Sequence, residues 1–177
     1  MPNQSSLAWG KKVSVEFRKK VVEVASYLGT KPDYLMAIIN YESNGTFRAD
    51  WPDPQGGVGL ICFLKKTAQD YPLNTTQENL KKMTNVEQLD YVQKYLNQWR
   101  GRVSSLEDLY MAVLSPAAIG KPNDFPVFRE GTKNYKQNKR LDLNGDGEVT
   151  KYEASFEVRK SLQKGLMPEN AAPVEGD

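Results

Sequence analysis

The sequence lacks histidine altogether, and Cys62 is its only cysteine. Without histidine there can be no Ser-His-Asp or Cys-His catalytic triad, and the common zinc sites, which need histidine or several cysteines, are excluded as well. A single cysteine also excludes an intramolecular disulfide. Any acid–base chemistry in this chain must therefore rest on carboxylates, lysine, tyrosine or the one thiol.

Long apolar runs are also missing. No run approaches the roughly 18 residues that a membrane-spanning helix requires. The first residues, MPNQSSLAWGKK, contain no apolar segment typical of a secretory signal. The net charge is only +2, and the basic residues are spread along the 177 residues of the chain. We therefore expect synthesis in the cytoplasm without a signal peptide, no membrane insertion and no nucleic-acid partner. We also expect a monomer.

Most of the chain has helical periodicity. Apolar residues recur at helical spacing in residues 17–28, 35–39, 89–99 and 106–113. Four residue pairs have the spacing of a capping box and are expected to begin helices: Thr30 with Asp33, Thr84 with Glu87, Ser104 with Glu107, and Thr150 with Glu153. The last of these helices should run to about Leu166. The sequence thus predicts a mainly α fold, long enough to bury a core without disulfides or a metal.

Other segments do not have a helical pattern. Residues 44–57 contain two prolines and three glycines, which predicts a loop. The run VGLICFL, residues 58–64, predicts either a strand or the buried start of a helix. Residues 120–140 are rich in lysine and asparagine and are weakly patterned. The tail MPENAAPVEGD, residues 167–177, is expected to be disordered.

The segment DLNGDGEVTKYE, residues 142–153, fits the template of an EF-hand calcium loop. In that template, side-chain oxygens come from Asp142, Asn144 and Asp146, and Gly147 permits the sharp turn. The remaining ligands would be the backbone carbonyl of Glu148, a water held by Thr150, and both carboxylate oxygens of Glu153. The sequence therefore predicts a Ca²⁺ site that braces the fold. The alternative is an acidic turn that binds no ion.

The stretch LMAIINYES, residues 35–43, places a carboxylate where an apolar residue is expected. Leu35, Ile38 and Ile39 lie on one face of a helix, and Glu42 occupies the next position on that face. Burial and the negative end of the helix dipole both favour a protonated carboxyl, so the pKa of Glu42 should be raised. A glycosidase general acid needs that property. The alternative is that the helix ends early and Glu42 points into solvent.

Three motifs in order along the chain resemble those of a known family. They are Glu42-Ser43, the G-x-G-L of residues 57–60, and LEDLYMAVLSPAAIGK, residues 106–121. Together they are similar to the lysozyme-like domain of soluble lytic transglycosylases, goose-type lysozymes and related phage endolysins. The resemblance covers the helical segments from about residue 13 to residue 121. It implies a lysozyme-like helical domain of the lytic-transglycosylase type.

The resemblance implies an enzyme that cleaves the β-1,4 bond between MurNAc and GlcNAc in bacterial peptidoglycan. Glu42 matches the family's catalytic glutamate, which protonates the glycosidic oxygen. In transglycosylases the deprotonated residue then activates the C6 hydroxyl of MurNAc, which closes on C1 and gives a 1,6-anhydro product. The resemblance also implies a substrate-binding set of Ser43, Gly57, Gly59, Leu60, Ile61, Cys62 and Phe63. The tyrosine of the third motif has no assigned counterpart here; Tyr110, on the same predicted helix, is a candidate to reach the cleft, and the alternative is that it packs in the core.

Several alternatives stay open at the level of sequence. Goose-type members use carboxylates to direct a water, and Asp53 resembles one of these acids, although it also suits an Asx-type turn between Pro52 and Pro54. Cys62 stands where the family usually has glutamine, so the chain could be a wall-binding relative without turnover. Residues 114–116, Leu-Ser-Pro, replace the Ala-Tyr-Asn of many transglycosylases. A calcium-responsive interaction module is the third possibility.

The expected organisation has four parts. Residues 1–12 form an N-terminal tail, residues 13–125 the lysozyme-like catalytic domain, and residues 126–166 an EF-hand-like calcium-binding segment packed on it. The disordered tail follows. A wall-cutting enzyme without a signal peptide would act on the cell wall or in the periplasm, as a phage lysis or virion protein or as an effector injected by a secretion apparatus.

Overall fold

The computed structural model describes residues 6–176 and is mainly helical, as the periodicity predicts. Within these residues there are nine α-helices: α1 (Val15–Leu28), α2 (Pro32–Glu42), α3 (Lys65–Gln69), α4 (Gln77–Lys82), α5 (Asn85–Leu96), α6 (Leu106–Leu114), α7 (Lys133–Asn138), α8 (Lys151–Ala154) and α9 (Phe156–Gly165). Four short strands form two antiparallel pairs: β1 (Ser6–Leu7) with β4 (Ala172–Pro173), and β2 (Pro126–Arg129) with β3 (Glu148–Thr150). None of the described helices is long and apolar enough to cross a membrane.

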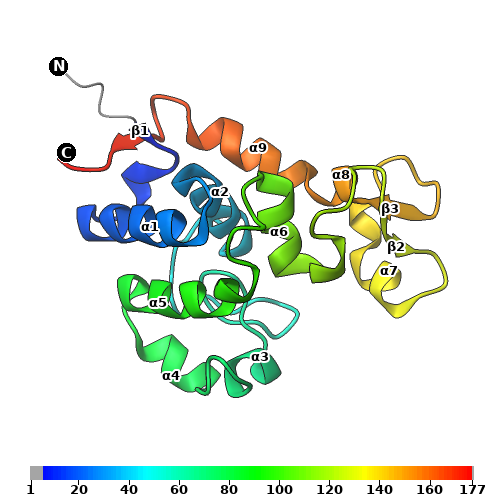
Figure 1. Cartoon of the computed structure of the whole chain (residues 1–177), viewed down its shortest axis with the longest axis horizontal. Coiled ribbons are helices and arrows are strands. Elements are labelled where there is room, and N and C mark those ends of the chain that lie inside the picture. The colour runs from blue at the N-terminus through cyan, green and yellow to red at the C-terminus, as the bar shows by residue number, and fades with distance from the viewer. Residues whose placement is uncertain (1–5, 177) are drawn as a thin grey trace.

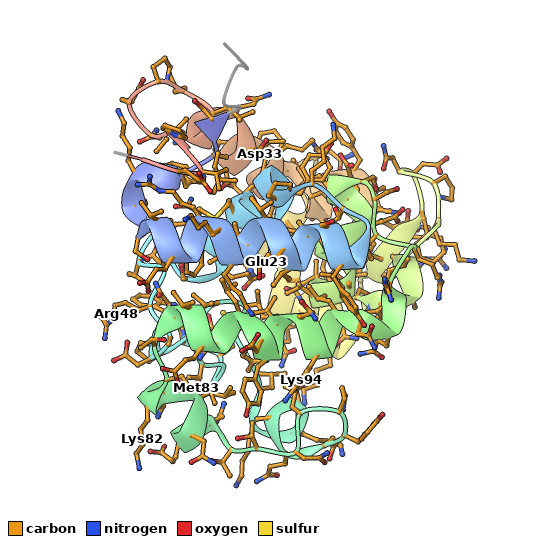
Figure 2. All side chains as sticks on the ribbon, turned by 60° about the vertical axis from the view of Figure 1, so that its left-hand side comes forward. Glu23, Asp33, Arg48, Lys82, Met83 and Lys94 are labelled. Carbon is orange, nitrogen blue, oxygen red and sulfur yellow. The ribbon has the colours of Figure 1, made fainter. Side chains whose placement is uncertain are left out.

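Helix α2 lies at the centre of the molecule. Residues 35–39 are all buried, because α1, α6 and α9 pack against different sides of this helix. Helices α1 and α5 lie side by side in both views of the chain (Figures 1 and 2). Because the middle of α2, residues 35–39, is buried in the core, the position of its last residue, Glu42, is fixed by that packing.

Several helix boundaries agree with the sequence signals. Helix α1 ends at Gly29, which has the positive φ of 78° that favours glycine. The side chain of Thr84 accepts a hydrogen bond from the backbone of Glu87 at the start of α5. Thr150 and Glu153 form the complete capping box that was predicted. Side-chain chemistry within four residues therefore determines these ends.

Other boundaries differ from the prediction. Helix α2 begins at Pro32 without a side-chain cap. Asp33, which is labelled in Figure 2, instead accepts a hydrogen bond from the backbone N–H of Ala8 at 2.8 Å. Helix α6 is capped by Ser105 rather than Ser104. The helix expected after Thr150 is divided at Ser155 into α8 and α9. Residues 58–64 are neither strand nor helix but a tight turn in which Val58 pairs with Phe63.

Residues 120–140 contain two elements that their weak pattern did not predict. Strand β2 pairs with β3, with Phe128 opposite Val149 and Arg129 opposite Glu148, and helix α7 follows β2. In Figure 1 these elements form the end of the molecule farthest from the two termini. The acidic loop of residues 142–153 belongs to this end and begins just after α7.

The structure corrects the prediction that both ends of the chain are tails. In the described part of the chain, Leu7, Ala8 and Trp9 are buried, and β1 pairs with β4 at Ala172. Residues 1–5 and residue 177 lie outside the described part. The prediction of a disordered segment after residue 166 is therefore wrong for residues 167–176. Local composition misled it, because the partners of this segment are more than 150 positions away in the sequence.

Arg18 shows how the C-terminal segment is held. Its guanidinium donates hydrogen bonds to the carbonyl oxygens of Pro173, at 3.1 Å, and Gly176, at 2.8 Å. The N–H of Lys11 donates to the carbonyl of Asn170 at 3.1 Å, and Ala171 and Ala172 are buried. These contacts hold the C-terminal segment against α1 and against the segment that precedes α1.

Ending the chain after Met167 should destabilise the protein. The truncation removes the β1–β4 pair and the acceptors of Arg18, so we expect the free energy of unfolding to fall by about 2–4 kcal/mol. Urea denaturation would measure it. The control is Glu175→Ala, which removes only an exposed ion pair with Lys19 and should cost about 0.5 kcal/mol or less. Equal stability of the truncated and full-length chains would contradict the packing described.

Candidate active-site cleft and acidic loop

A cleft of ≈ 730 Å³ opens at the C-terminal end of α2. One wall is the turn-rich loop after α2, a second is the end of α6, and the third comes from β2, α7 and the 3₁₀ turn Lys139–Leu141. The residues that line it are Tyr41, Glu42, Asp53, Gln55, Ile61, Cys62, Leu64, Tyr110, residues 113–116, Phe128, Asn134, Gln137, Asn138 and Arg140.

Glu42 is partly buried at the edge of this cleft, as the last residue of α2. Burial raises its pKa from 4.5 to about 7, and the negative charge of Asp53 acts in the same direction. The neighbouring polar side chains of Cys62 and Tyr110 and the positive charge of Arg140 lower the pKa by smaller amounts. The predicted upward shift is therefore confirmed, and its main cause is removal of the carboxyl from water.

Tyr110 and Cys62 approach Glu42 from two different walls. Tyr110, on α6, is 1% exposed and makes an edge-to-face contact with Tyr41. The Cys62 thiol donates a hydrogen bond to the backbone carbonyl of Glu42 at 3.1 Å. Burial raises the pKa of this thiol, and the charge of Glu42 adds to that effect, so the thiol stays protonated. Cys62 thus serves as a donor beside the glutamate and not as a nucleophile.

Asp53 is both a turn residue and a cleft residue. Its Oδ2 accepts a hydrogen bond from the backbone N–H of Gln55 at 3.0 Å, which is the Asx-type turn considered from the sequence. The same side chain lines the cleft, and its charge acts on Glu42. Asp53 therefore forms the turn and also remains a candidate residue of the active site.

Five of the residues expected to bind substrate do not line the cleft. They are Ser43, Gly57, Gly59, Leu60 and Phe63. The buried hydroxyl of Ser43 donates to the carbonyl of Ile39 at 2.7 Å and accepts from the N–H of Phe47 at 3.0 Å, so it closes the end of α2. Leu60 and Phe63 belong to the hydrophobic core.

The two glycines are needed for packing within the protein. A Cβ on Gly57 would lie 2.7 Å from the carbonyl oxygen of Cys62, and one on Gly59 would collide with the side chain of Gln88. Gly59 also has a φ of 84°. The absence of a Cβ at these two positions is therefore required by contacts within the chain itself.

Gln88, which the sequence did not single out, holds the loop in place. Its side chain is fully buried on α5. Its Oε1 accepts from the N–H of Leu60 at 2.9 Å, and its Nε2 donates to the carbonyls of Ala49, at 2.9 Å, and Leu80, at 3.0 Å. The only feature of the sequence that could have identified Gln88 is its position next to Leu89, which faces the core. The polar residues of α7 and the turn after it were also missed.

The acidic loop brings three of its predicted ligands together. Oxygens of Asp142, Asp146 and Glu153 lie within 4.8 Å of one another, and Glu153 is 8% exposed. The side chain of Glu153 extends across the loop, where its Oε2 accepts a hydrogen bond from the backbone N–H of Leu143 at 2.8 Å. Oxygen donors at this separation suit a hard divalent cation such as Ca²⁺.

The other predicted ligands have mixed positions. Asn144 is exposed, and its Oδ1 accepts from the N–H of Asp146 at 3.2 Å. The backbone of Glu148 is part of β3, and its carboxylate lies 3.3 Å from Arg129. Thr150 caps α8. Asp142 accepts a hydrogen bond from the Tyr135 hydroxyl at 2.7 Å, which lowers the pKa of this carboxyl and raises the pKa of Tyr135 to about 12.

Comparison with known proteins gave no relative for this chain: no protein-family model, curated protein or solved structure matches it. The functional argument therefore depends on the residues and the geometry of the cleft.

The shifted pKa of Glu42 should appear in the stability of the protein. Between pH 4.5 and about 7 the unfolded chain has lost this proton while the folded chain keeps it, so the free energy of unfolding falls as the pH rises. Glu42→Gln removes this dependence. Its stability relative to wild type should therefore increase across that window, by at most roughly 3 kcal/mol, and stay constant on either side.

Urea denaturation of both proteins from pH 4 to pH 8 measures this difference. Any contact that the amide makes or loses adds an offset that does not change with pH, so the offset serves as an internal reference. Parallel stability curves would mean that Glu42 ionises in the folded protein as it does in the unfolded chain.

Proposed function

We propose that this protein cleaves the β-1,4 glycosidic bond between MurNAc and GlcNAc in bacterial peptidoglycan, with Glu42 as the general acid. The observation that carries the proposal is a carboxyl at the edge of a large cleft that keeps its proton to about pH 7. The ordered motifs that resemble lytic transglycosylases and goose-type lysozymes support it. The proposed fold is accordingly the lysozyme-like domain of that family.

In the proposed reaction Glu42 acts twice. It first protonates the glycosidic oxygen as the bond from C1 of MurNAc breaks. The resulting carboxylate then takes the proton from the C6 hydroxyl of the same sugar, whose oxygen closes on C1. The product is a 1,6-anhydro ring, and no second catalytic carboxylate is required, in contrast to most glycosidases. Tyr110 lines the cleft together with Glu42, and the Cys62 thiol donates to the backbone carbonyl of Glu42, so both residues would help to position the carboxyl.

Hydrolysis is the second candidate, because Asp53 lines the same cleft. In that reaction Asp53 would direct a water to C1 in place of the C6 hydroxyl. A wall-binding protein without turnover is the least supported candidate. A protein that only binds the wall does not need a protonated carboxyl in its cleft, whereas burial raises the pKa of Glu42 and keeps this carboxyl protonated.

Glu42→Gln should abolish clearing of purified cell walls. General acid catalysis contributes about 10²- to 10⁴-fold, so the rate should fall by at least about 100-fold while the fold is kept. Glu16→Gln, which changes an exposed glutamate of α1, is the matched control and should clear walls at the wild-type rate. Equal clearing by wild type and Glu42→Gln would rule out the role given to Glu42.

Mass spectrometry of the products separates the two chemistries. Anhydro ends indicate transglycosylation, and reducing ends, heavier by one water, indicate hydrolysis. Asp53→Asn should reduce the release of reducing ends and leave the release of anhydro ends nearly unchanged. If all products end in the anhydro ring and Asp53→Asn is fully active, hydrolysis is excluded.

We also propose that the acidic loop binds Ca²⁺ as a structural ion. The residues fit it, because the cluster supplies only oxygen donors and Gly147 has the positive φ, 86°, that the turn of such a loop requires. Asp142, Asp146 and Glu153 would hold the ion, with Asn144 and the carbonyl of Glu148 completing the set. The bound ion would offset two of the three negative charges of the clustered carboxylates, next to the third wall of the cleft.

Calcium should raise the melting temperature. At a free concentration 100 times the dissociation constant, the gain should be about 5–10 °C for a chain of this size. EDTA should reverse it, and Glu153→Gln should remove it. Asp124→Asn, a nearby exposed residue outside the cluster, should respond like wild type. A melting temperature that calcium and EDTA leave unchanged would contradict a structural ion.

A further inference from the structure

Arg140 is a cation placed in the cleft beside the proposed general acid. It comes from the 3₁₀ turn Lys139–Leu141, and no other lysine or arginine is among the described residues that line the cleft. Its charge acts on Glu42, Tyr41 and Tyr110, all of which line the same cleft. The guanidinium therefore faces the same space as Glu42.

The charge of Arg140 is not neutralised within the described part of the chain. Arg48, Arg129 and Arg159 each lie within 4.0 Å of a carboxylate, and Arg140 does not. Its side chain donates one hydrogen bond, from Nη1 to the carbonyl of Gln137 at 3.2 Å. A guanidinium has five N–H donors, so donors remain for a ligand.

This cation does not assist the acid role of Glu42, because its charge lowers the pKa that burial raises. A bound carboxylate at Arg140 would offset that effect and use the remaining donors. Guanidinium groups bind carboxylates through two parallel hydrogen bonds, a geometry that an ammonium cannot reproduce.

We propose that Arg140 is a specificity-determining residue that binds a carboxylate on the lactyl-peptide arm of MurNAc. This inference rests on the proposed function. MurNAc differs from GlcNAc by its lactyl group, whose carboxylate is free in peptide-free glycan chains. In peptide-bearing strands that carboxylate is an amide, and the stem peptide supplies carboxylates instead. Arg140 thus distinguishes wall glycan from a neutral β-1,4 glycan of GlcNAc alone.

The test compares cleavage kinetics on three substrates: peptide-free glycan chains, the same chains with their lactyl carboxylates methyl-esterified, and peptide-bearing strands. Arg140→Ala should raise KM about tenfold on the substrate whose carboxylate it binds, with kcat within about twofold, because a charge-assisted hydrogen bond is lost. On esterified chains Arg140→Ala and wild type should have the same KM. Arg140→Lys should recover only part of the loss.

Lys139→Ala is the matched control. Lys139 is in the same 3₁₀ turn and is exposed, but it lines a separate groove with Lys133 and Lys136. Its removal takes away one positive charge without changing the cleft, so it should leave KM unchanged on all three substrates. Melting temperatures of these exposed-site variants should stay close to wild type.

The outcomes separate the two proposals. A loss on peptide-free chains assigns the lactyl carboxylate as the ligand, and a loss only on peptide-bearing strands assigns the stem peptide. An equal loss on free and esterified chains, or no loss anywhere while wild type cleaves, overturns the role of Arg140 alone. If wild type cleaves none of the substrates, the proposed function and this inference are both overturned.

Discussion

The removal of one carboxyl group from water is the constraint on which the candidate site depends. Glu42 is the last residue of a helix that three other helices enclose, so the core determines where its side chain points. Burial at that point outweighs the effects of the neighbouring polar side chains and of the charge of Arg140, and the pKa rises to about 7. The apolar stripe of α2 therefore has two effects. It anchors the helix in the core, and it raises the pKa of the carboxyl at its last position, so that Glu42 keeps its proton until the pH is near neutral.

The walls of the cleft are fixed by polar contacts made behind them. Gln88 fastens the loop of residues 44–64 to α5, and Gly57 and Gly59 allow the close contacts that this requires. On the opposite side, two ion pairs reach the first turn of α6. The buried Lys151 of the acidic loop pairs with Asp108, and Arg159 of α9 lies 3.6 Å from Glu107. That helix also carries Tyr110. The acidic loop is thus joined to the α6 wall of the cleft, although Lys151 and Asp108 are 43 positions apart in the sequence.

Local signals in the sequence predicted the local features well. The stripe of Leu35, Ile38 and Ile39 located the end of α2 and the burial of Glu42, and the pair Thr150 and Glu153 located the start of α8. Features that depend on distant partners were not predictable in the same way. Ala172 pairs with Leu7, and the turn before Asp142 supplies Arg140 to the cleft, yet neither segment has a periodic pattern. Ser43 and Gly59 were predicted to bind substrate because a motif does not show which parts of the chain itself a residue contacts.

The central claim is tested most directly by titrating the Glu42 carboxyl carbon by NMR, with the spectrum of Glu42→Gln to assign its resonance. A midpoint near pH 7 is the result that this account predicts. A midpoint near 4.5, the ordinary value for a glutamic acid, would contradict it, because the side chain would then be charged whenever a glycan entered the cleft.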